Sequence, residues 1–183
     1  DRDSEALKIL KKGLRKANKP DIILVFCYNR GVKYVAAKQT ARAIPCFEII
    51  THQAPSKAKP LYQLSFINLA AIYMKTDPPR AIETLNRAAE AIPNDPTILF
   101  SLGRMNSDEK QFEKAINAFQ KAEKALEESD TKTEKLSAIF YLHYGGAYER
   151  SGQIDKAEEI FEKYLKTHPE THEILNYLAY MWA

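Results

Sequence analysis

Four histidines are the side chains of this sequence best suited to metal binding or acid–base chemistry. Two of them, His168 and His172, are four residues apart, a spacing that places both imidazoles on one face of a continuous helix. Pro169 lies between them, and proline disfavours helix at its own position and at the residue before it. We therefore expect a helix boundary between the two histidines, and no metal site is predicted.

The two cysteines could form a metal site or a disulfide. Cys27 and Cys46 are 19 positions apart, which matches no zinc-ligand spacing. Both are interpreted as small apolar residues in the cores of helices. A disulfide between adjacent helices is left open, because its geometry cannot be read from the sequence.

No other group of residues forms a catalytic motif. The acidic pairs at 127–128 and 158–159 are accompanied by lysines, as on the solvated faces of helices. The run Tyr144-Gly145-Gly146-Ala147 lacks the pattern of a phosphate-binding loop, and close helix packing explains its glycines. The chain is therefore predicted to be non-catalytic and to hold no cofactor.

Composition favours helices over sheets. The 183 residues are 45% hydrophobic and include 23 alanines, but only three valines and six glycines. A sheet protein of this length would need more β-branched residues and more glycine turns, so an all-α fold is predicted. The net charge of +3 is too balanced to indicate nucleic-acid binding. The longest apolar run, 22–27, is too short to span a bilayer.

A spacing of small residues and phenylalanines recurs along the chain. In three segments a glycine precedes an alanine by 12 positions, and that alanine precedes a phenylalanine by four. A fourth segment has the same order with one residue fewer in the turn and leucine in place of phenylalanine. The four sets are Gly31, Ala43 and Phe47; Ala70, Ala81 and Leu85; Gly103, Ala115 and Phe119; and Gly145, Ala157 and Phe161. Small residues let two helices approach closely, so each set predicts a packed helix pair.

With prolines after the second helices, at Pro93 and Pro169, this pattern resembles the tetratricopeptide repeat family. The resemblance implies a right-handed α-solenoid of about ten helices, truncated at both ends, as one continuous domain. It divides the chain into the second helix of a preceding repeat at 1–20, full units at 21–59, 60–93, 94–137 (with an extended loop) and 138–171, and the first helix of a truncated unit at 172–183. Because the chain begins at Asp1 rather than Met, we expect that an upstream segment has been removed.

In this family the first helix of each unit lines a concave groove. Transferring those positions gives nine candidate groove residues: Tyr28, Asn29, Asn68, Phe100, Arg104, His143, Arg150, Asn176 and Tyr177. The aromatic residues would act as anchors, the asparagines would hydrogen-bond an extended backbone, and the arginines would pair with acidic groups of a partner. Salt bridges to neighbouring acidic residues are the alternative for the arginines. The residues that clamp chaperone-tail carboxylates in one subset of the family are absent except for Asn68, so that ligand is disfavoured.

The sequence therefore predicts a non-catalytic scaffold that binds a peptide or helix of a protein partner, without nucleic acid and without a transmembrane segment. The alternative is a structural or regulatory repeat segment of a larger multidomain or self-associating protein. Self-association would bury the apolar faces of the terminal helices, including Leu175, Leu178 and Trp182. The ending Leu-Asn-Tyr-Leu-Ala-Tyr-Met-Trp-Ala resembles repeat starts of bacterial members. It indicates a bacterial source and leaves open cytoplasm, periplasm or a lipid anchor.

Overall fold

The structure is a computed structural model that describes residues 2–14, 20–53, 59–128 and 137–183. The expected loop, at 127–135, lies mostly outside these residues. The described part is all-α, as predicted, and contains no strand. Its helices are α1 (Arg2–Leu14), α2 (Pro20–Ala36), α3 (Thr40–Thr51), α4 (Lys59–Tyr73), α5 (Pro78–Ala91), α6 (Pro96–Asp108), α7 (Phe112–Glu127), α8 (Ala138–Arg150), α9 (Ile154–Leu165) and α10 (His172–Trp182).

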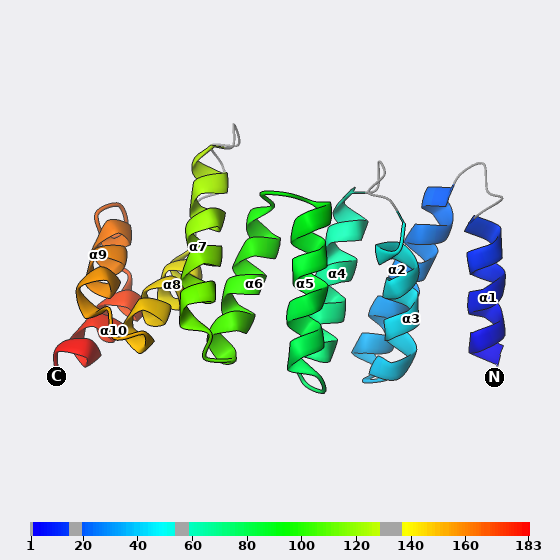
Figure 1. Cartoon of the computed structure of the whole chain (residues 1–183), viewed down its shortest axis with the longest axis horizontal. Coiled ribbons are helices and arrows are strands. Elements are labelled where there is room, and N and C mark those ends of the chain that lie inside the picture. Colours follow the sequence, from blue (N-terminus) through cyan, green and yellow to red (C-terminus); the bar gives the residue numbers. More distant parts are fainter. Residues whose placement is uncertain (1, 15–19, 54–58, 129–136) are drawn as a thin grey trace. The chain divides into compact units, whose positions relative to one another are not determined.

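The helices pack as sequential antiparallel pairs within two compact units. Unit 1 comprises 1–93 and unit 2 comprises 94–183. In unit 1, α2 packs on α3 and α4 packs on α5; in unit 2, α6 packs on α7 and α8 packs on α9 (Figure 1). The final helix, α10, contacts both α8 and α9. The predicted boundaries between individual repeats remain a prediction, although α2 and α4 each begin one residue before the unit predicted for them.

The small residues and the phenylalanines that follow them meet across each pair. A Cβ added to Gly103 on α6 would lie 2.6 Å from Cε1 of Phe119 on α7, and one added to Gly31 would lie 2.8 Å from Cε1 of Phe47. Gly145 faces Phe161 in the same way. All three phenylalanines are completely buried. Glycine is therefore required at these positions by the ring opposite, not by the backbone conformation.

The second pair of unit 1 has a leucine where the other pairs have a phenylalanine. Ala70 on α4 and Leu85 on α5 occupy the positions of the glycine and the phenylalanine, and both are completely inaccessible to solvent or nearly so. A methyl group on one helix is thus matched by a smaller side chain on the other. Keeping the summed volume of the two side chains nearly constant keeps the packing of the pair tight.

A common turn joins the helices in three of the pairs. Lys38, Lys110 and Gly152 each adopt a positive φ (57°, 59° and 81°). The residue after each one donates its N–H back to the carbonyl five positions earlier, as Gln111 does to Asn106 at 2.8 Å. This is the Schellman arrangement, which satisfies carbonyls left free at a helix C-terminus. It usually takes glycine, so Gly152 was expected in a turn and the two lysines were not.

The fourth pair turns differently because it has one residue fewer. Asp77 caps α5 by accepting a hydrogen bond from the N–H of Arg80, and Pro78 follows as the first helical residue. Both features favour a helix start, since the carboxylate satisfies a free N–H and proline has none to satisfy. Asp95 and Pro96 begin α6 by the same means. In α3 the interior Pro45 is accommodated without ending the helix.

Candidate partner-binding surface

Six of the nine candidate residues belong to unit 2, where α8 lies against both α6 and α10. Phe100 and Arg104 stand one turn apart on α6, and His143 is on α8 with Arg150 two turns further along. Tyr177 comes from α10. Gly103, Gly145 and Ala147 are buried in the helix pairs, whereas these five candidates are half-buried or exposed.

Phe100 joins one arginine to the histidine. Its ring lies edge-on to the His143 imidazole, with centroids 5.8 Å apart, and the guanidinium of Arg104 stands 5.8 Å from its centroid. On its other side the ring contacts Phe119 and Phe140 of the core. Phe100 is therefore held by the core while one edge supports two nitrogen-bearing side chains at the surface.

Gly146 forms the second meeting point. A Cβ added there would lie 3.1 Å from Nη2 of Arg150 and 3.1 Å from the hydroxyl oxygen of Tyr177. Arg150 Nε donates to the Gly146 carbonyl at 2.9 Å, and the Tyr177 hydroxyl donates to Glu149 at 3.3 Å. Gly146 is thus a buried residue against which a guanidinium and a phenol both pack. We call these two meeting points together the Arg104–Arg150 cluster, made of Phe100, Arg104, His143, Gly146, Arg150 and Tyr177.

The charged groups of the cluster give a positive electrostatic potential at His143. Burial lowers the pKa of this imidazole, and the positive charges of Arg104 and Arg150 lower it further, against an opposing effect of Asp108. Neither arginine forms an ion pair with a described residue. The pKa of Tyr177 is raised by burial and by the nearby carboxylate of Glu149, so its hydroxyl stays a hydrogen-bond donor. The cluster therefore offers the guanidinium groups of Arg104 and Arg150 to a ligand, while the Tyr177 hydroxyl is engaged by Glu149.

The unit 1 candidates do not form a comparable cluster. Tyr28 packs edge-on against Phe47, with centroids 5.9 Å apart, so much of it belongs to the core. Asn29 is exposed, and the amide nitrogen of Asn68 donates to the carbonyl of Leu64 at 2.8 Å on its own helix. Exposed apolar side chains also occur on this unit, at Ile22, Val25, Phe26, Val32 and Leu64. In unit 2 the remaining candidate, Asn176, is exposed on α10.

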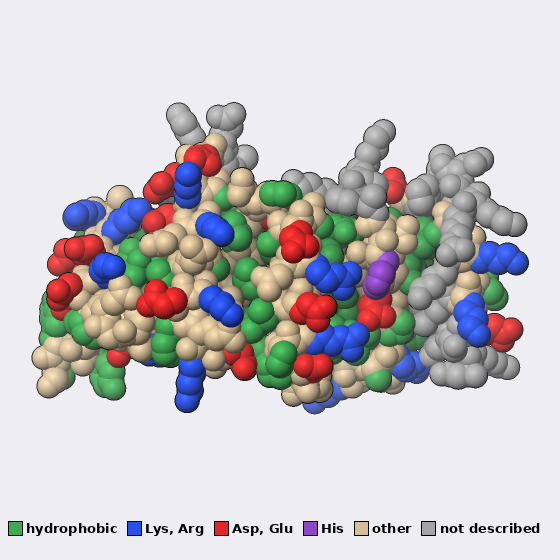
Figure 2. Space-filling view, in the orientation of Figure 1, with side chains coloured by type: hydrophobic (Ala, Val, Ile, Leu, Met, Phe, Trp, Pro, Cys, Tyr) green, Lys and Arg blue, Asp and Glu red, His purple; other side chains and the backbone are tan. Residues whose placement is uncertain are grey.

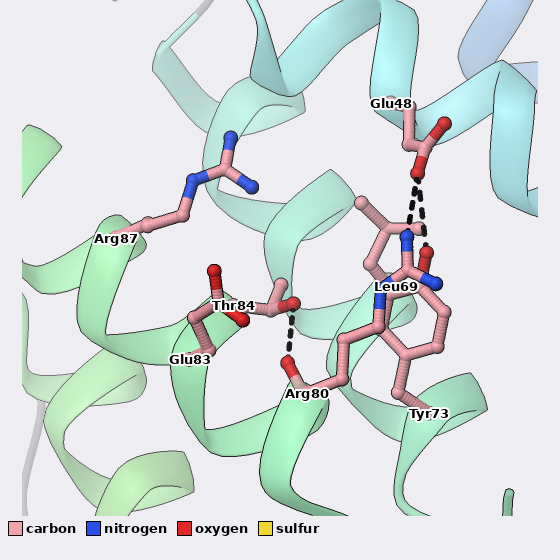
Figure 3. A pocket seen from close by; sticks show the side chains of 7 residues that line it. All are labelled: Glu48, Leu69, Tyr73, Arg80, Glu83, Thr84 and Arg87. Atoms are coloured by element: carbon pink, nitrogen blue, oxygen red, sulfur yellow. Dashed lines mark hydrogen bonds and ion pairs between the residues drawn. The ribbon is translucent and has the colours of Figure 1, made fainter. Parts of the chain in front are cut away.

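Sequence reasoning missed one polar pocket, which lies in unit 1 (Figure 3). It is lined by Glu48 of α3, Leu69 and Tyr73 of α4, and Arg80, Glu83, Thr84 and Arg87 of α5. Glu48 accepts hydrogen bonds from the hydroxyl of Tyr73 (3.2 Å) and from Arg80 (3.3 Å), and the Arg80 guanidinium stacks 4.2 Å from the Tyr73 centroid.

The hydrogen bonds in this pocket join α3, α4 and α5. Figure 3 shows the carboxylate of Glu48 engaged by its two donors, while Arg87 extends away from them. The lining combines equal numbers of acidic and basic side chains. The signal that could have found it is the alternation of acidic and basic residues on the second helices, whereas the candidate residues all came from first helices.

Charges on second helices generally pair with one another. In unit 2, Lys163 contacts Glu123 at 2.9 Å and Glu127 at 3.3 Å, and Tyr141 donates to Glu123 at 3.1 Å. On the face drawn in Figure 2, acidic and basic side chains are accordingly interspersed rather than gathered by sign. Arg104 and Arg150 differ from this pattern because they form no ion pair within the part of the chain that the structure describes, which makes their cluster the stronger candidate for contact with a partner.

The histidine and cysteine predictions have clear structural outcomes. His168 lies beyond the end of α9 and stacks on Tyr164, with centroids 4.5 Å apart, while His172 begins α10. The two histidines thus do not share a helix. Cys27 and Cys46 are buried and unbridged, and burial together with Cys46 raises the pKa of the Cys27 thiol to about 11. Among the described residues no group of three or more His, Cys, Asp or Glu side chains could hold a metal ion.

Two family models match the chain. Both are models of the tetratricopeptide repeat, and they match residues 73–131 and 138–181, which together exceed half of the chain. The chain belongs to the tetratricopeptide repeat family. Repeats of this family mediate protein–protein interactions and are typically non-catalytic. No curated protein matches the chain in sequence.

Solved tetratricopeptide repeat structures share the fold. MamA from Desulfovibrio magneticus RS-1 has a TM-score of 0.60 at 23% identity, covering 93% of this chain and 88% of that one. YrrB, described as a tetratricopeptide repeat protein with an unusual peptide-binding site, scores 0.62 at 21% identity, covering 97% and 84%. PilF from Pseudomonas aeruginosa scores 0.61 at 15% identity, covering 93% and 71%.

Among the described residues, no helix combines the length and the apolar character that crossing a membrane requires. The longest, α2 and α7, have 17 and 16 residues and carry charged side chains.

Proposed function

We propose that this tetratricopeptide repeat chain is a non-catalytic scaffold that binds a peptide or helix of a partner protein on the faces of its first helices. The Arg104–Arg150 cluster is the observation that supports this most strongly. It combines a half-buried aromatic ring, a phenol and two arginines without ion-pair partners among the described residues. Arginine and aromatic side chains are the residues that most often anchor protein interfaces. The peptide-binding site named for YrrB gives a precedent on the same fold.

Affinity capture with matched charge variants tests the proposal. The double variant Arg104→Ala/Arg150→Ala removes the two cluster arginines. The control Lys121→Ala/Lys124→Ala removes two exposed basic residues from the second helix α7. We expect wild type and control to retain the same partners and the cluster variant to lose them. Equal recovery by all three proteins would show that partners bind elsewhere.

Self-association through α10 is a second candidate function with its own observation. Ala179 has the position of Gly145, which is fully buried in its helix pair, yet Ala179 is exposed. Around it Leu175, Tyr180 and Trp182 expose 40%, 77% and 66% of their surface. An apolar face of this kind is stabilised when a neighbouring helix covers it. A second copy of the chain would supply such a helix.

A further inference from the structure

We propose that the segment bound at the Arg104–Arg150 cluster is acidic, with a carboxylate held beside His143 by the guanidinium groups of Arg104 and Arg150. This inference rests on the proposed function and specifies its ligand. It commits to a peptide segment bearing Glu or Asp, because the charge and donor pattern of the cluster are complementary to a carboxylate.

The geometry keeps both guanidinium groups available. Arg104 is positioned by the Phe100 ring rather than by an acidic residue, and stacking leaves the edge of a guanidinium free to donate. Arg150 uses Nε to bond the Gly146 carbonyl, which orients the group and leaves its terminal nitrogens for a ligand. Phe112 of α7 lies 6.0 Å from the same guanidinium and supports it from one side. Both cations are therefore oriented without being neutralised.

Two carboxylates lie in the neighbourhood, and their roles differ from that of a ligand carboxylate. Glu149 accepts the hydrogen bond of Tyr177, so its carboxylate is engaged toward α10. Asp108 is exposed near the end of α6, and its effect on the His143 imidazole is opposed by the two arginines. The net electrostatic effect of these charges at the imidazole is positive, and a positive potential attracts a further carboxylate.

Gly146 sets where the Arg150 guanidinium lies. Because this residue has no side chain, Arg150 Nη2 and the Tyr177 hydroxyl both pack closely over it. The hydroxyl already donates its single proton to Glu149, so the terminal nitrogens of Arg150 are the donors left for a ligand. A methyl group at position 146 would approach Arg150 Nη2 and the hydroxyl oxygen to 3.1 Å each. Because Arg150 is exposed and flexible, its guanidinium can give way to the methyl group, which would move the cation proposed to hold the carboxylate.

His143 should link binding to pH. The charged groups that act on it are Arg104 and Asp108 of α6 and Arg150 of α8, with Tyr177 of α10 adjoining Arg150. A bound carboxylate would favour the protonated imidazole and so raise its pKa. Binding would then take up a proton, and affinity would rise as the pH falls from about 8 to about 5.5, where Glu side chains of a peptide remain ionised.

Fluorescence anisotropy with two probe peptides tests the inference. The probes are fluorescein-labelled peptides of identical length with the same leucine and phenylalanine anchors, one carrying glutamates and the other glutamines at the remaining positions. We expect the glutamate probe to bind at least about tenfold more tightly than the glutamine probe, and Arg104→Ala or Arg150→Ala to remove most of that difference. His143→Gln should remove the pH dependence of the glutamate probe.

Gly146→Ala is the variant that separates the site from the fold. We expect it to keep the wild-type melting temperature and to weaken the glutamate probe about tenfold, with the glutamine probe unchanged. Equal binding of the two probes would overturn the acidic ligand and leave the proposed function standing. Tighter binding of the glutamine probe would do the same. If neither probe binds, the acidic ligand is overturned, and capture of partners through Arg104 and Arg150 decides the proposed function separately.

Discussion

At the scale of single residues, a glycine facing a phenylalanine sets the distance between paired helices. The sequence predicted a closely packed helix pair here, because Gly103, Ala115 and Phe119 keep the same spacing as their counterparts elsewhere. The structure confirms it, since the ring of Phe119 occupies the space that a side chain at position 103 would need. The close packing could be predicted because it depends only on positions along two adjacent helices.

Gly103→Ala should therefore destabilise the chain. Alanine favours helix over glycine by about 1 kcal/mol, but the added methyl group would meet three atoms of a fully buried ring, and overpacking of this kind costs about 1–3 kcal/mol or more. Urea unfolding measures the change in the free energy of unfolding.

Gly13→Ala in α1 is the matched control for this substitution. There the methyl group would meet only Ile23, at an ordinary 3.6 Å, so we expect a neutral or slightly stabilising effect. Equal effects of the two substitutions would show that the ring opposite Gly103 does not set the helix separation.

His143 should make the stability of unit 2 depend on pH. Its pKa in the folded chain is lowered, first by burial and then by Arg104, whereas the unfolded chain has the ordinary value of about 6.5. The unfolded state therefore binds the proton first as the pH falls. Stability is complete above about pH 6.5 and is lost below it. Chemical denaturation at about pH 8 and about pH 5.5 should show a smaller loss for His143→Gln than for wild type.

The sign of this effect is opposite to that expected for binding. Acidification weakens the free fold and strengthens the contact with a carboxylate, because a ligand charge stabilises the imidazolium that the empty site disfavours. A stability loss of the same size in His143→Gln would assign the pH dependence to other groups. The histidine was predicted as a polar contact from its position, but its neighbours on α6 could not be predicted from sequence.

At the scale of elements, the turn between paired helices is encoded less directly. Gly152 was expected in a turn, and its φ of 81° confirms this. Lys110 and Lys38 take the same left-handed conformation although lysine disfavours it. The sequence did not reveal this because the conformation is imposed by the length of the connection and by the hydrogen bonds that close the Schellman turn.

Exchanging these turn residues gives a reciprocal test. Lys110→Gly should stabilise the chain by about 1 kcal/mol, and Gly152→Lys should destabilise it by a similar amount, because a left-handed residue with a side chain is strained by about that much. A side chain at position 152 would meet no atom within 4 Å, so only the backbone conformation contributes. Thermal unfolding of both variants measures the effect, and shifts in the same direction would contradict the account.

Polar side chains on the second helices were the part of the structure that sequence analysis left out. The hydrogen bonds that Glu48 accepts from Tyr73 and Arg80 join three helices, and the bonded residues are up to 32 positions apart in the sequence. Such a network depends on which helix faces which, and only the three-dimensional arrangement decides that. The family resemblance directed attention to first helices. It therefore selected Phe100, Arg104, His143, Arg150 and Tyr177, which lie on neighbouring helices, and passed over this pocket.

At the scale of the whole molecule, composition was enough to predict the class of fold. The excess of alanine over valine excluded sheets, and the recurring spacing predicted the helix pairs. Which partner the chain binds does not follow from these features, because many sequences satisfy the same packing while differing at exposed positions. The exposed face of α10 likewise does not follow from these features, because its burial depends on a second chain or helix.

Light scattering across a range of protein concentrations tests self-association. If α10 is covered by a second copy, the mean mass should rise with concentration, because the exposed faces of Leu175, Tyr180 and Trp182 are removed from water on association. Tyr180→Ser should reduce the rise, while Lys121→Ala on α7 should leave it unchanged. A constant monomer mass at every concentration would contradict self-association.

Site-specific photocrosslinking in cells tests the central claim, which is that a partner binds the first-helix face of unit 2. A benzophenone amino acid would replace Ile139 of α8, which is 59% exposed and shares its helix with His143 and Arg150. The matched position is Lys121 of α7, which is exposed on a second helix. The account predicts a discrete crosslinked partner from position 139, reduced by Arg104→Ala/Arg150→Ala, and none from position 121. Crosslinks from position 121 alone, or crosslinks from position 139 that are unchanged by the arginine substitutions, would contradict it.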